Sequence, residues 1–361
     1  MRTRRFVKTH EGGKYQEVGP GDDKHTCAKI LLCFGLLLVI GAVIGFLIVV
    51  LRTGSCKYNI QPYKANTPIR TIAFGSCARD DLSIFSEINA DVLVFLGDNV
   101  YADTGSPTSL QATYDRLSCK PEFQDLVNRT RHVLSIWDDH DYGYNDVGAD
   151  NPIKNESKSI FSEFWKIPDE RRLKAGVYGS YVFNMSNGTT VSIIVPDLRF
   201  FREPLQLCEH GEYAPREKCY CPTNRSLLGD VQWAWLEDAV NRSQRSDALT
   251  IIASSTQFGH AANGYESWTN FPRDRARLRA LLDPRKSLVI SGDVHWGEIS
   301  VLDGLVDVTS SGFSEVDLDV LPNANRMGNA VSQRNYGLID LENRTVSIYG
   351  VGHKRLLSIN V

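Results

Sequence analysis

Apolar residues of this chain fall into short runs, most of which end abruptly in glycine or acidic residues. Residues 92–96 are all apolar, and Gly97, Asp98 and Tyr101 follow closely. An unbroken apolar run of this length predicts a strand that is buried on both faces. Ligands of open α/β sheets bind just beyond the carboxyl ends of such strands, where a glycine permits a sharp turn. We therefore expect this strand to direct a carboxylate and a phenol into a crevice.

From residue 69 onward, strand-like and helix-like segments alternate. Buried or alternating apolar patterns predict strands at 70–74, 132–137, 181–184, 190–195, 250–253, 287–290, 299–302 and 305–309, and a final hairpin at 336–351. Helical periodicity predicts helices at 84–90, 110–117, 122–128, 229–242 and 273–282. The pattern contains no internal repeat and no clear second boundary. Residues 69–361 are therefore expected to form a single α/β domain.

One earlier segment has a different pattern, because residues 30–51 carry no charge and are almost entirely apolar. As a helix, these 22 residues would span about 33 Å, enough to cross a hydrocarbon core of about 30 Å. The alternative is a cleaved signal peptide, whose apolar region is usually shorter and ends in small residues. We predict a transmembrane anchor at 30–51, between a tail at 1–29 and a linker at 52–68.

Flanking residues and glycosylation sequons predict the orientation of this anchor. Basic residues cluster before the span, which favours a cytoplasmic N-terminus. The Asn-x-Ser/Thr acceptor pattern occurs only after the span, at Asn128, Asn155, Asn184, Asn187, Asn224, Asn241 and Asn343. At Asn187 a following glycine gives the alternative of a simple hairpin turn. We expect a single-pass membrane protein whose large domain is lumenal or extracellular and glycosylated.

Charge and cysteine positions narrow the function further. A net charge of −3 shows no excess of basic residues, so we expect no nucleic-acid partner. Six of the eight cysteines follow the span, in a compartment where disulfides form. Cys208, Cys219 and Cys221 cluster in a polar segment and predict a disulfide, with a zinc site as the alternative.

Side chains suited to metal binding and proton transfer collect just after the predicted strands. They are Cys77, Asp98, Tyr101, Asp138, Asp139, His140, Asp197, Arg199, Asp293 and His295. A single aspartate after a strand often caps a helix or starts a turn, but five strand ends of this kind favour a metal centre. Two cations can neutralise a phosphate ester and supply hydroxide, with Asp98 as the bridging ligand. Cys77 and Tyr101 suit Fe³⁺ better than Mg²⁺, whereas the alternatives for Cys77 are a buried thiol, half of a disulfide or a nucleophile.

The order of these motifs resembles that of the PhoD-like (alkaline phosphatase D) branch of the calcineurin-like metallophosphatases. The matching segments are 74–77, 97–101, 137–141, 197–199, 228–236, 292–295, 309–312 and 336–339. The resemblance implies an αββα sandwich, here preceded by one transmembrane helix, and a two- or three-metal centre of Fe³⁺ and Ca²⁺. Its metal ligands would be Cys77, Asp98, Tyr101, Asp139, Asp293 and His295. For the remaining histidine ligand of the wider superfamily, Gln257 and His260 compete.

The expected function is that of a membrane-anchored phosphatase or phosphodiesterase that hydrolyses phosphate mono- or diesters through a metal-bound hydroxide. His140 would protonate the leaving oxygen, while Arg199 and the cations would stabilise the charge on the phosphate. The alternative is a non-catalytic ectodomain that keeps the fold as a receptor or adhesion module.

Overall fold

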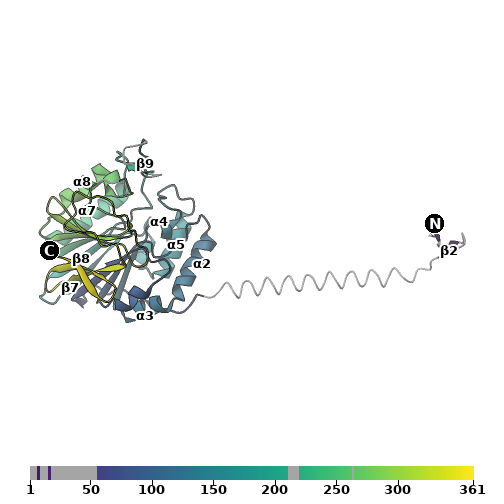
Figure 1. Ribbon diagram of the computed structural model, residues 1–361, viewed down its shortest axis with the longest axis horizontal. Coiled ribbons are helices and arrows are strands. Elements are labelled where there is room, and N and C mark those ends of the chain that lie inside the picture. Colours follow the sequence, from purple (N-terminus) through teal and green to yellow (C-terminus); the bar gives the residue numbers. More distant parts are fainter. Residues whose placement is uncertain (1–5, 9–14, 18–54, 210–218, 262–263) are drawn as a thin grey trace. The chain divides into compact units, whose positions relative to one another are not determined.

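The computed structural model describes residues 6–8, 15–17, 55–209, 219–261 and 264–361 (Figure 1). The chain divides into two units, Met1–Gly54 and Ser55–Val361. In the first unit, β1 (Phe6–Lys8) pairs antiparallel with β2 (Tyr15–Glu17). The predicted anchor at 30–51 lies outside the described residues. Within the described part, none of the helices combines the length and the apolar character needed to cross a bilayer.

The second unit contains two large mixed sheets. The six-stranded sheet has the order β17-β16-β15-β4-β5-β6 and the seven-stranded sheet the order β13-β14-β12-β11-β8-β7-β3. The strands of the first are β4 (Thr71–Gly75), β5 (Val92–Leu96), β6 (His132–Ile136), β15 (Asn335–Asp340), β16 (Thr345–Gly350) and β17 (Lys354–Asn360). Those of the second are β3 (Pro68–Ile69), β7 (Gly179–Met185), β8 (Thr190–Val195), β11 (Leu249–Ala253), β12 (Ser287–Ser291), β13 (Gly297–Leu302) and β14 (Leu305–Ser310).

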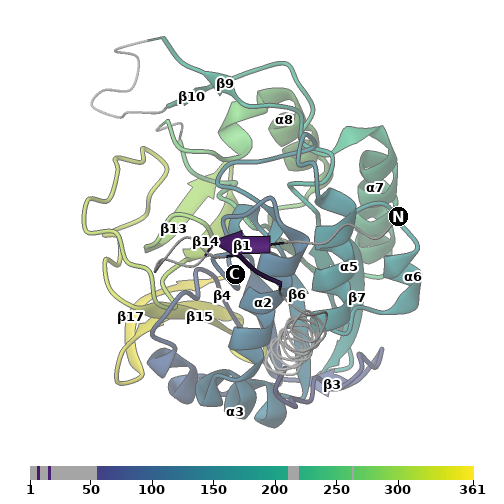
Figure 2. The same ribbon diagram turned by 90° about the vertical axis from the view of Figure 1, so that its right-hand side faces the viewer.

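The two sheets pack face to face, and helices cover both outer faces. Alternate side chains of β5, such as Val92 and Val94, enter the core between the sheets, while Leu93 and Phe95 face the helices. Helices α2 (Pro107–Ser118), α3 (Pro121–Arg129) and α5 (Lys154–Phe164) cover the six-stranded sheet, and α7 (Gly229–Arg245) and α8 (Pro272–Leu281) cover the other (Figures 1 and 2). This arrangement explains why the run 92–96 is apolar throughout, and it confirms the predicted sandwich.

Most predicted elements are present within a few residues, but several were missed. Helix α5 begins without a side-chain cap at Ile153, so the sequence lacks the usual start signal. Strand β17 lies at a sheet edge with largely exposed or half-exposed side chains, so its apolar pattern is weak. The short elements missed are 3₁₀-helix η2 (Trp268–Asn270), α4 (Asp139–Tyr142), α6 (Asp169–Arg172), β3, β9 (Gln206–Leu207) and β10 (Tyr220–Cys221). The helix predicted at 84–90 is the 3₁₀-helix η1 (Ser83–Glu87).

Parallel pairing brings the polar strand ends together. Strands β4, β5 and β6 are parallel neighbours, as are β8, β11 and β12. Two disulfides link nearby segments: Cys56 bonds to Cys119, and Cys208 to Cys221. The predicted disulfide in the cluster near residue 208 is thus confirmed, whereas Cys77 and Cys219 are free thiols.

Candidate metal centre and active site

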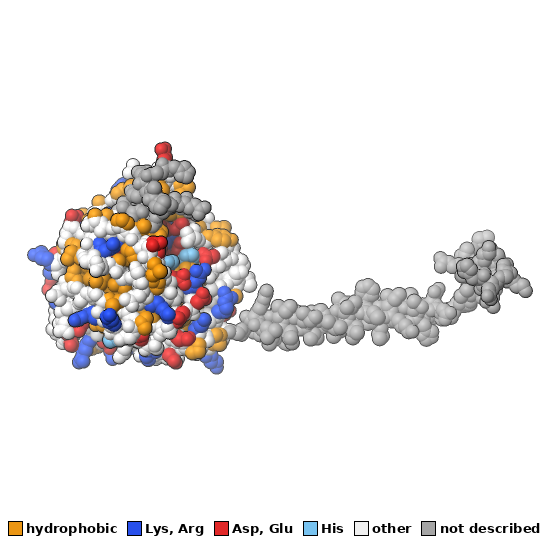
Figure 3. Space-filling model, in the orientation of Figure 1, with side chains coloured by type: hydrophobic (Ala, Val, Ile, Leu, Met, Phe, Trp, Pro, Cys, Tyr) orange, Lys and Arg blue, Asp and Glu red, His pale blue; other side chains and the backbone are white. Residues whose placement is uncertain are grey.

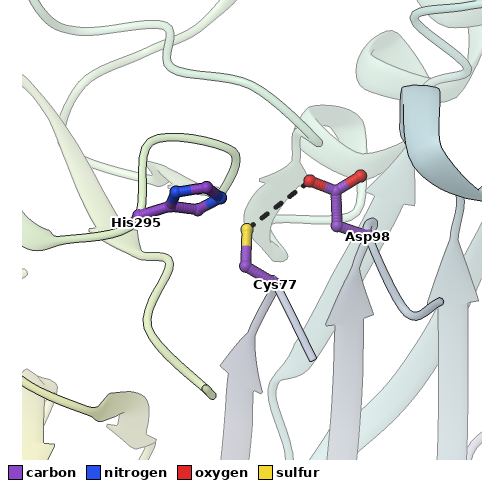
Figure 4. A group of neighbouring side chains, drawn as sticks. All are labelled: Cys77, Asp98 and His295. Atoms are coloured by element: carbon purple, nitrogen blue, oxygen red, sulfur yellow. Dashed lines mark hydrogen bonds between the residues drawn. The ribbon is translucent and has the colours of Figure 1, made fainter. Parts of the chain in front are cut away.

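Cys77 and Asp98 lie side by side because they follow the parallel strands β4 and β5. The Cys77 Sγ is 3.6 Å from Asp98 Oδ2, and the His295 ring points toward both from the loop after β12 (Figure 4). One ligand atom from each of the three residues fits within a 4.8 Å group. The structure therefore brings together three predicted metal ligands from three separate strand ends.

Asp98 is shared by three groups of side chains that could hold a cation. Besides the group with Cys77 and His295, it belongs to one with Asp139 and His140 and to one with Asp138 and Asp293. The side chain of Asp98 is almost fully buried, and its Oδ1 accepts no hydrogen bond in the described part of the chain. This central position is what a carboxylate that bridges neighbouring cations requires.

Unusual backbone conformations orient the side chains of the candidate metal centre. Positive φ angles, which L-residues rarely adopt, occur at Cys77, Asp98, Asp103, Asp146, Asp293 and His295. Such strain clusters at functional sites, where the surrounding structure holds it in place. Gly97 has φ of 102°, and a Cβ there would lie 2.6 Å from the Asp138 Cβ. Only glycine therefore lets the ends of β5 and β6 come this close.

The Cys77 thiol is buried between two serine hydroxyls, close to the Asp98 carboxylate. Its Sγ lies 3.1 Å from Ser311 Oγ and 3.3 Å from Ser76 Oγ, and burial raises its pKa to about 12. A thiol with this pKa is not a nucleophile at neutral pH, because the thiolate is the reactive form. A nearby cation would stabilise the thiolate, so this environment suits a metal ligand better than a nucleophile.

Two acids at the centre, Asp98 and Asp293, form no ion pair with a basic side chain of the described residues. Burial, followed by repulsion from neighbouring acids, raises the pKa of Asp98 and of Asp293 well above the ordinary range. The unpartnered oxygen of Asp98, together with sulfur, carboxylate and imidazole donors, fits a centre for metal ions. The donor set is therefore consistent with a metal centre, while the identities Fe³⁺ and Ca²⁺ stay a prediction.

Asp139 differs from Asp98 although the two contribute to the same group. Burial opposes ionisation, but the charges of Arg199 and His140 lower the pKa of Asp139 to about 2. Its oxygens also accept hydrogen bonds from the backbone N–H groups of His140 and Asp146, at 3.0 and 2.7 Å. Asp139 is thus an anion even without a metal ion.

Arg199 lies beneath the acids, with a fully buried guanidinium group. Its Nε donates to Asp138 Oδ1 at 2.6 Å and its Nη1 to Glu266 Oε2 at 2.7 Å. Arg202, also buried, has its Nε 3.0 Å from Glu266 Oε1. These contacts position Arg199 and balance charge, while its Nη2 lies 3.8 Å from Asp139 Oδ1 and has no hydrogen-bond partner among the described residues. The expected contact of Arg199 with phosphate stays a prediction.

His140 and Tyr101 occupy the opposite side of the centre. The Nδ1 of His140 lies 2.5 Å from Asp103 Oδ1, and its ring packs 4.3 Å from the ring of Tyr101. The hydroxyl of Tyr101 lies 3.1 Å from His295 Nε2. Asp103 had no role in the predicted site, but here it holds the histidine that was predicted to act as the acid.

A cavity of about 300 Å³ opens over these groups, lined by Asp98, Asp139, His140, Asn145, Asp146, Tyr220, Gly264, Tyr265, Glu266, Asp293, Val294, His295 and Asp317. Figure 3 shows histidine, acidic and basic side chains gathered on this face, near α4. Sequence reasoning missed Asp146 and Glu266, which form a further group with Asp139. Both lie in loops away from the strand ends, so no strand pattern marks them.

Several other predicted residues lie elsewhere. The Asp197 carboxylate accepts hydrogen bonds from Trp137 Nε1 and the backbone N–H of Val177, at 2.8 and 2.9 Å, and therefore supports the fold. Gln257 donates to Glu298, and neither Gln257 nor His260 lines the cavity or joins a metal-binding group of the described residues. Six predicted glycosylation sites are exposed, whereas Asn184 is half-buried and donates to the Asn66 carbonyl.

Comparison with known proteins agrees with this geometry. The family model of the PhoD-like phosphatases matches residues 112–318, more than half of the chain. The structure entitled "Structure of PhoD" is similar, with a TM-score of 0.61 and 16% identity over 81% of this chain and 67% of that chain. No curated protein sequence gives a significant match.

Two further solved structures share the fold at lower identity. A purple acid phosphatase from yellow lupin seeds matches with a TM-score of 0.53 and 12% identity over 82% of this chain and 54% of that one. GAP50, described as the anchor in the inner membrane complex of Plasmodium, matches with a TM-score of 0.52 and 10% identity over 81% and 88%. These two matches show the fold alone, whereas the family match covers Asp139, His140 and Asp293. The chain belongs to the PhoD-like phosphatase family.

Proposed function

We propose that this protein hydrolyses phosphate mono- or diesters at a centre of Fe³⁺ and Ca²⁺. The observation that carries the proposal is the position of Asp98, shared by three ligand groups at the floor of an open cavity. Cys77, Asp98, Tyr101 and His295 would hold the iron, and Asp98, Asp139 and Asp293 a second cation. When bound, such cations neutralise phosphate oxygens and lower the pKa of water.

The chain's own residues account for binding and proton transfer. Because Nδ1 of His140 is engaged by Asp103, its Nε2 is left to give a proton to the leaving oxygen. The Asp139 carboxylate would help to hold a cation, and Arg199 keeps Glu266 and Asp138 in position. Tyr220 donates to Asp146 Oδ2 at 2.6 Å and so fixes the far wall of the cavity.

We also propose the cellular setting that the sequence predicts. The cytoplasmic tail at 1–29 and the single span at 30–51 would tether the domain to a lumenal or extracellular membrane face. Two disulfides in the described part support an oxidising compartment. The exposed sequons support glycosylation, which an endoglycosidase-dependent mobility shift of the full-length protein would test; no shift would contradict this orientation.

The enzymatic proposal is tested with the purified full-length protein. Turnover of 4-nitrophenyl phosphate and bis(4-nitrophenyl) phosphate is measured, together with elemental analysis and the visible spectrum. Ferric thiolate or phenolate should give a charge-transfer band. Iron-free protein that turns over either ester would contradict the iron assignment, and metal-loaded protein that turns over neither would favour the receptor alternative.

A further inference from the structure

A second cavity, of about 230 Å³, adjoins the metal centre at Tyr101. Its lining is Ala78, Arg79, Asp80, Asn99, Val100, Tyr101, Thr113, Arg116, Leu117 and Lys120. The guanidinium group of Arg79 lies 4.9 Å from the centre of the Tyr101 ring, while the hydroxyl of the same ring reaches His295. Tyr101 therefore belongs to the wall of this cavity and to the metal centre at once.

This cavity is basic, because three cations line it against the single carboxylate of Asp80. Arg79 is only loosely paired with Glu315, at 3.5 Å and with both side chains partly exposed. The Nη2 of Arg116 donates to Thr113 Oγ1 at 2.8 Å, and Lys120 Nζ donates to a backbone carbonyl at 3.3 Å. In the described part of the chain, neither of these two side chains forms an ion pair.

The local fold fixes the backbone positions of two of the three basic residues. Arg116 lies in the last turn of α2, and Lys120 directly precedes α3. Between them, Cys119 is joined to Cys56 by a disulfide. A cation near a helix C-terminus often only stabilises the helix, but that role accounts for Arg116 alone. Preorganised charges bind an anion with less loss of conformational entropy.

We propose that this basic cavity is a substrate subsite that binds a second phosphate group of the molecule hydrolysed next to it. The inference rests on the proposed function, because the first phosphate would occupy the metal centre. Charge-assisted hydrogen bonds from Arg116 and Lys120 would hold the second phosphate. The preferred substrates are therefore phosphate esters that carry two phosphates, one on each side of Tyr101.

Calorimetric titration of the full-length protein with the non-hydrolysable phosphonate analogues of propyl phosphate and of 1,3-propanediol bisphosphate, in which a P–C bond replaces the ester bond, tests this subsite. We expect the bisphosphate analogue to bind about tenfold to a hundredfold more tightly, since hydrogen bonds to charged groups contribute this much. The double variant R116Q/K120Q should lose that preference and keep its affinity for the propyl phosphate analogue. The matched control R285Q/K286Q removes the same two charges from an exposed site before β12 and should keep the preference.

Turnover of 4-nitrophenyl phosphate, which has no second phosphate, separates this inference from the proposed function. R116Q/K120Q should hydrolyse it at the wild-type rate. Equal wild-type affinity for the two analogues, or a preference that survives in R116Q/K120Q, would overturn the subsite. A wild-type protein that prefers the bisphosphate analogue but hydrolyses no ester would overturn the proposed function and support the subsite.

Discussion

Two groups of buried carboxylates at the same edge of the sandwich differ in how their charge is balanced. Asp138 and Glu266 pair with the guanidinium group of Arg199, and Glu266 also with that of Arg202. Asp98 and Asp293 form no ion pair with any basic side chain of the described residues, and burial raises the pKa of both. The chain itself supplies cations to the first group, although Asp138 Oδ2 is buried without a hydrogen-bond partner among the described residues. The second group has no such cation among those residues.

This difference separates two roles that the residue type alone does not distinguish. Buried ions are stable when opposite charges and hydrogen bonds compensate their lost hydration. Where the chain supplies the cation, a carboxylate positions its neighbours; where it does not, the carboxylate is available to a metal. The distinction predicts different responses to neutralising substitutions in the two groups.

The largest effect should follow the substitution Asp98→Asn. Loss of the shared anion should lower kcat/KM for phosphate esters by about a thousandfold or more, in the range typical for loss of a main catalytic group. The metal-free variant should unfold close to the wild-type temperature, because burial raises the pKa of Asp98 and the amide then replaces a carboxyl group that is already neutral. Steady-state kinetics, elemental analysis and thermal unfolding after chelation give these values.

The exposed Asp230, in the first turn of α7, provides the matched control, and Asp230→Asn should leave activity and metal content unchanged. If metal-free Asp98→Asn were clearly less stable than the wild type, Asp98 would belong with the compensated group. Full turnover by Asp98→Asn would exclude the bridging role.

The substitution Glu266→Gln, in contrast, should lower the stability of the protein. It leaves two buried guanidinium groups without their shared anion, and breaking a buried pair of this kind typically costs about 3–5 kcal/mol of unfolding free energy. Glu163 is the matched control, because it also pairs with two basic residues, Lys166 and Arg172, but its side chain is 68% exposed. Glu163→Gln should cost less than about 1 kcal/mol. Equal losses in urea unfolding would show that burial does not distinguish the pairs.

Sequence reasoning located the uncompensated group better than the compensated one. Asp98, Asp293 and Cys77 directly follow strands whose apolar runs are plain in the sequence. Parallel strands bring their carboxyl ends together, so adjacency followed from the pattern. The same reasoning predicted most strands of both sheets, because strands buried on both faces leave a strong signal, whereas their arrangement as a sandwich was implied by the family resemblance.

Residues supplied by loops could not be placed in this way. Glu266 lies 13 residues beyond the end of β11, and Asp146 follows α4. Neither belongs to a strand or helix pattern that would predict where its side chain points. The pairing of Arg199 with Glu266 depends on the path of that loop, which local propensity does not determine. For this reason the sequence did not predict the ion pairs of Arg199 with Asp138 and Glu266.

A third kind of carboxylate sharpens the comparison. Asp307 is buried and forms no ion pair among the described residues, but it accepts hydrogen bonds from the N–H groups of Phe258 and Gly259 and from Ser291 Oγ. Burial raises its pKa from 3.8 to about 6. Since the folded state holds this proton more tightly, Asp307 contributes stability below pH 4 that is lost as pH rises through 6. The loss corresponds to about 3 kcal/mol.

Unfolding free energies of wild type and Asp307→Asn between pH 3.5 and 7.5 measure that contribution. The variant lacks the titrating group, so the difference between the two curves should change with pH over this window. A constant loss of an acceptor would shift the whole curve by the same amount at each pH. Parallel curves would show that Asp307 does not hold its proton in the folded state.

The smallest effect should come from Asp103, which pairs with His140 although its side chain is 41% exposed. Exposed pairs are worth less than about 1 kcal/mol, so Asp103→Asn should lower kcat by about fivefold at most. Stability should hardly change.

A double-mutant cycle with His140→Gln determines whether Asp103 acts through the histidine. His140→Gln alone should lower kcat by about a hundredfold or more, as expected for loss of a general acid. Adding Asp103→Asn to that variant should then have no further effect, because the group that it orients is already gone. Independent losses in the two backgrounds would place Asp103 in direct contact with substrate or cation and would extend the uncompensated group beyond the strand ends.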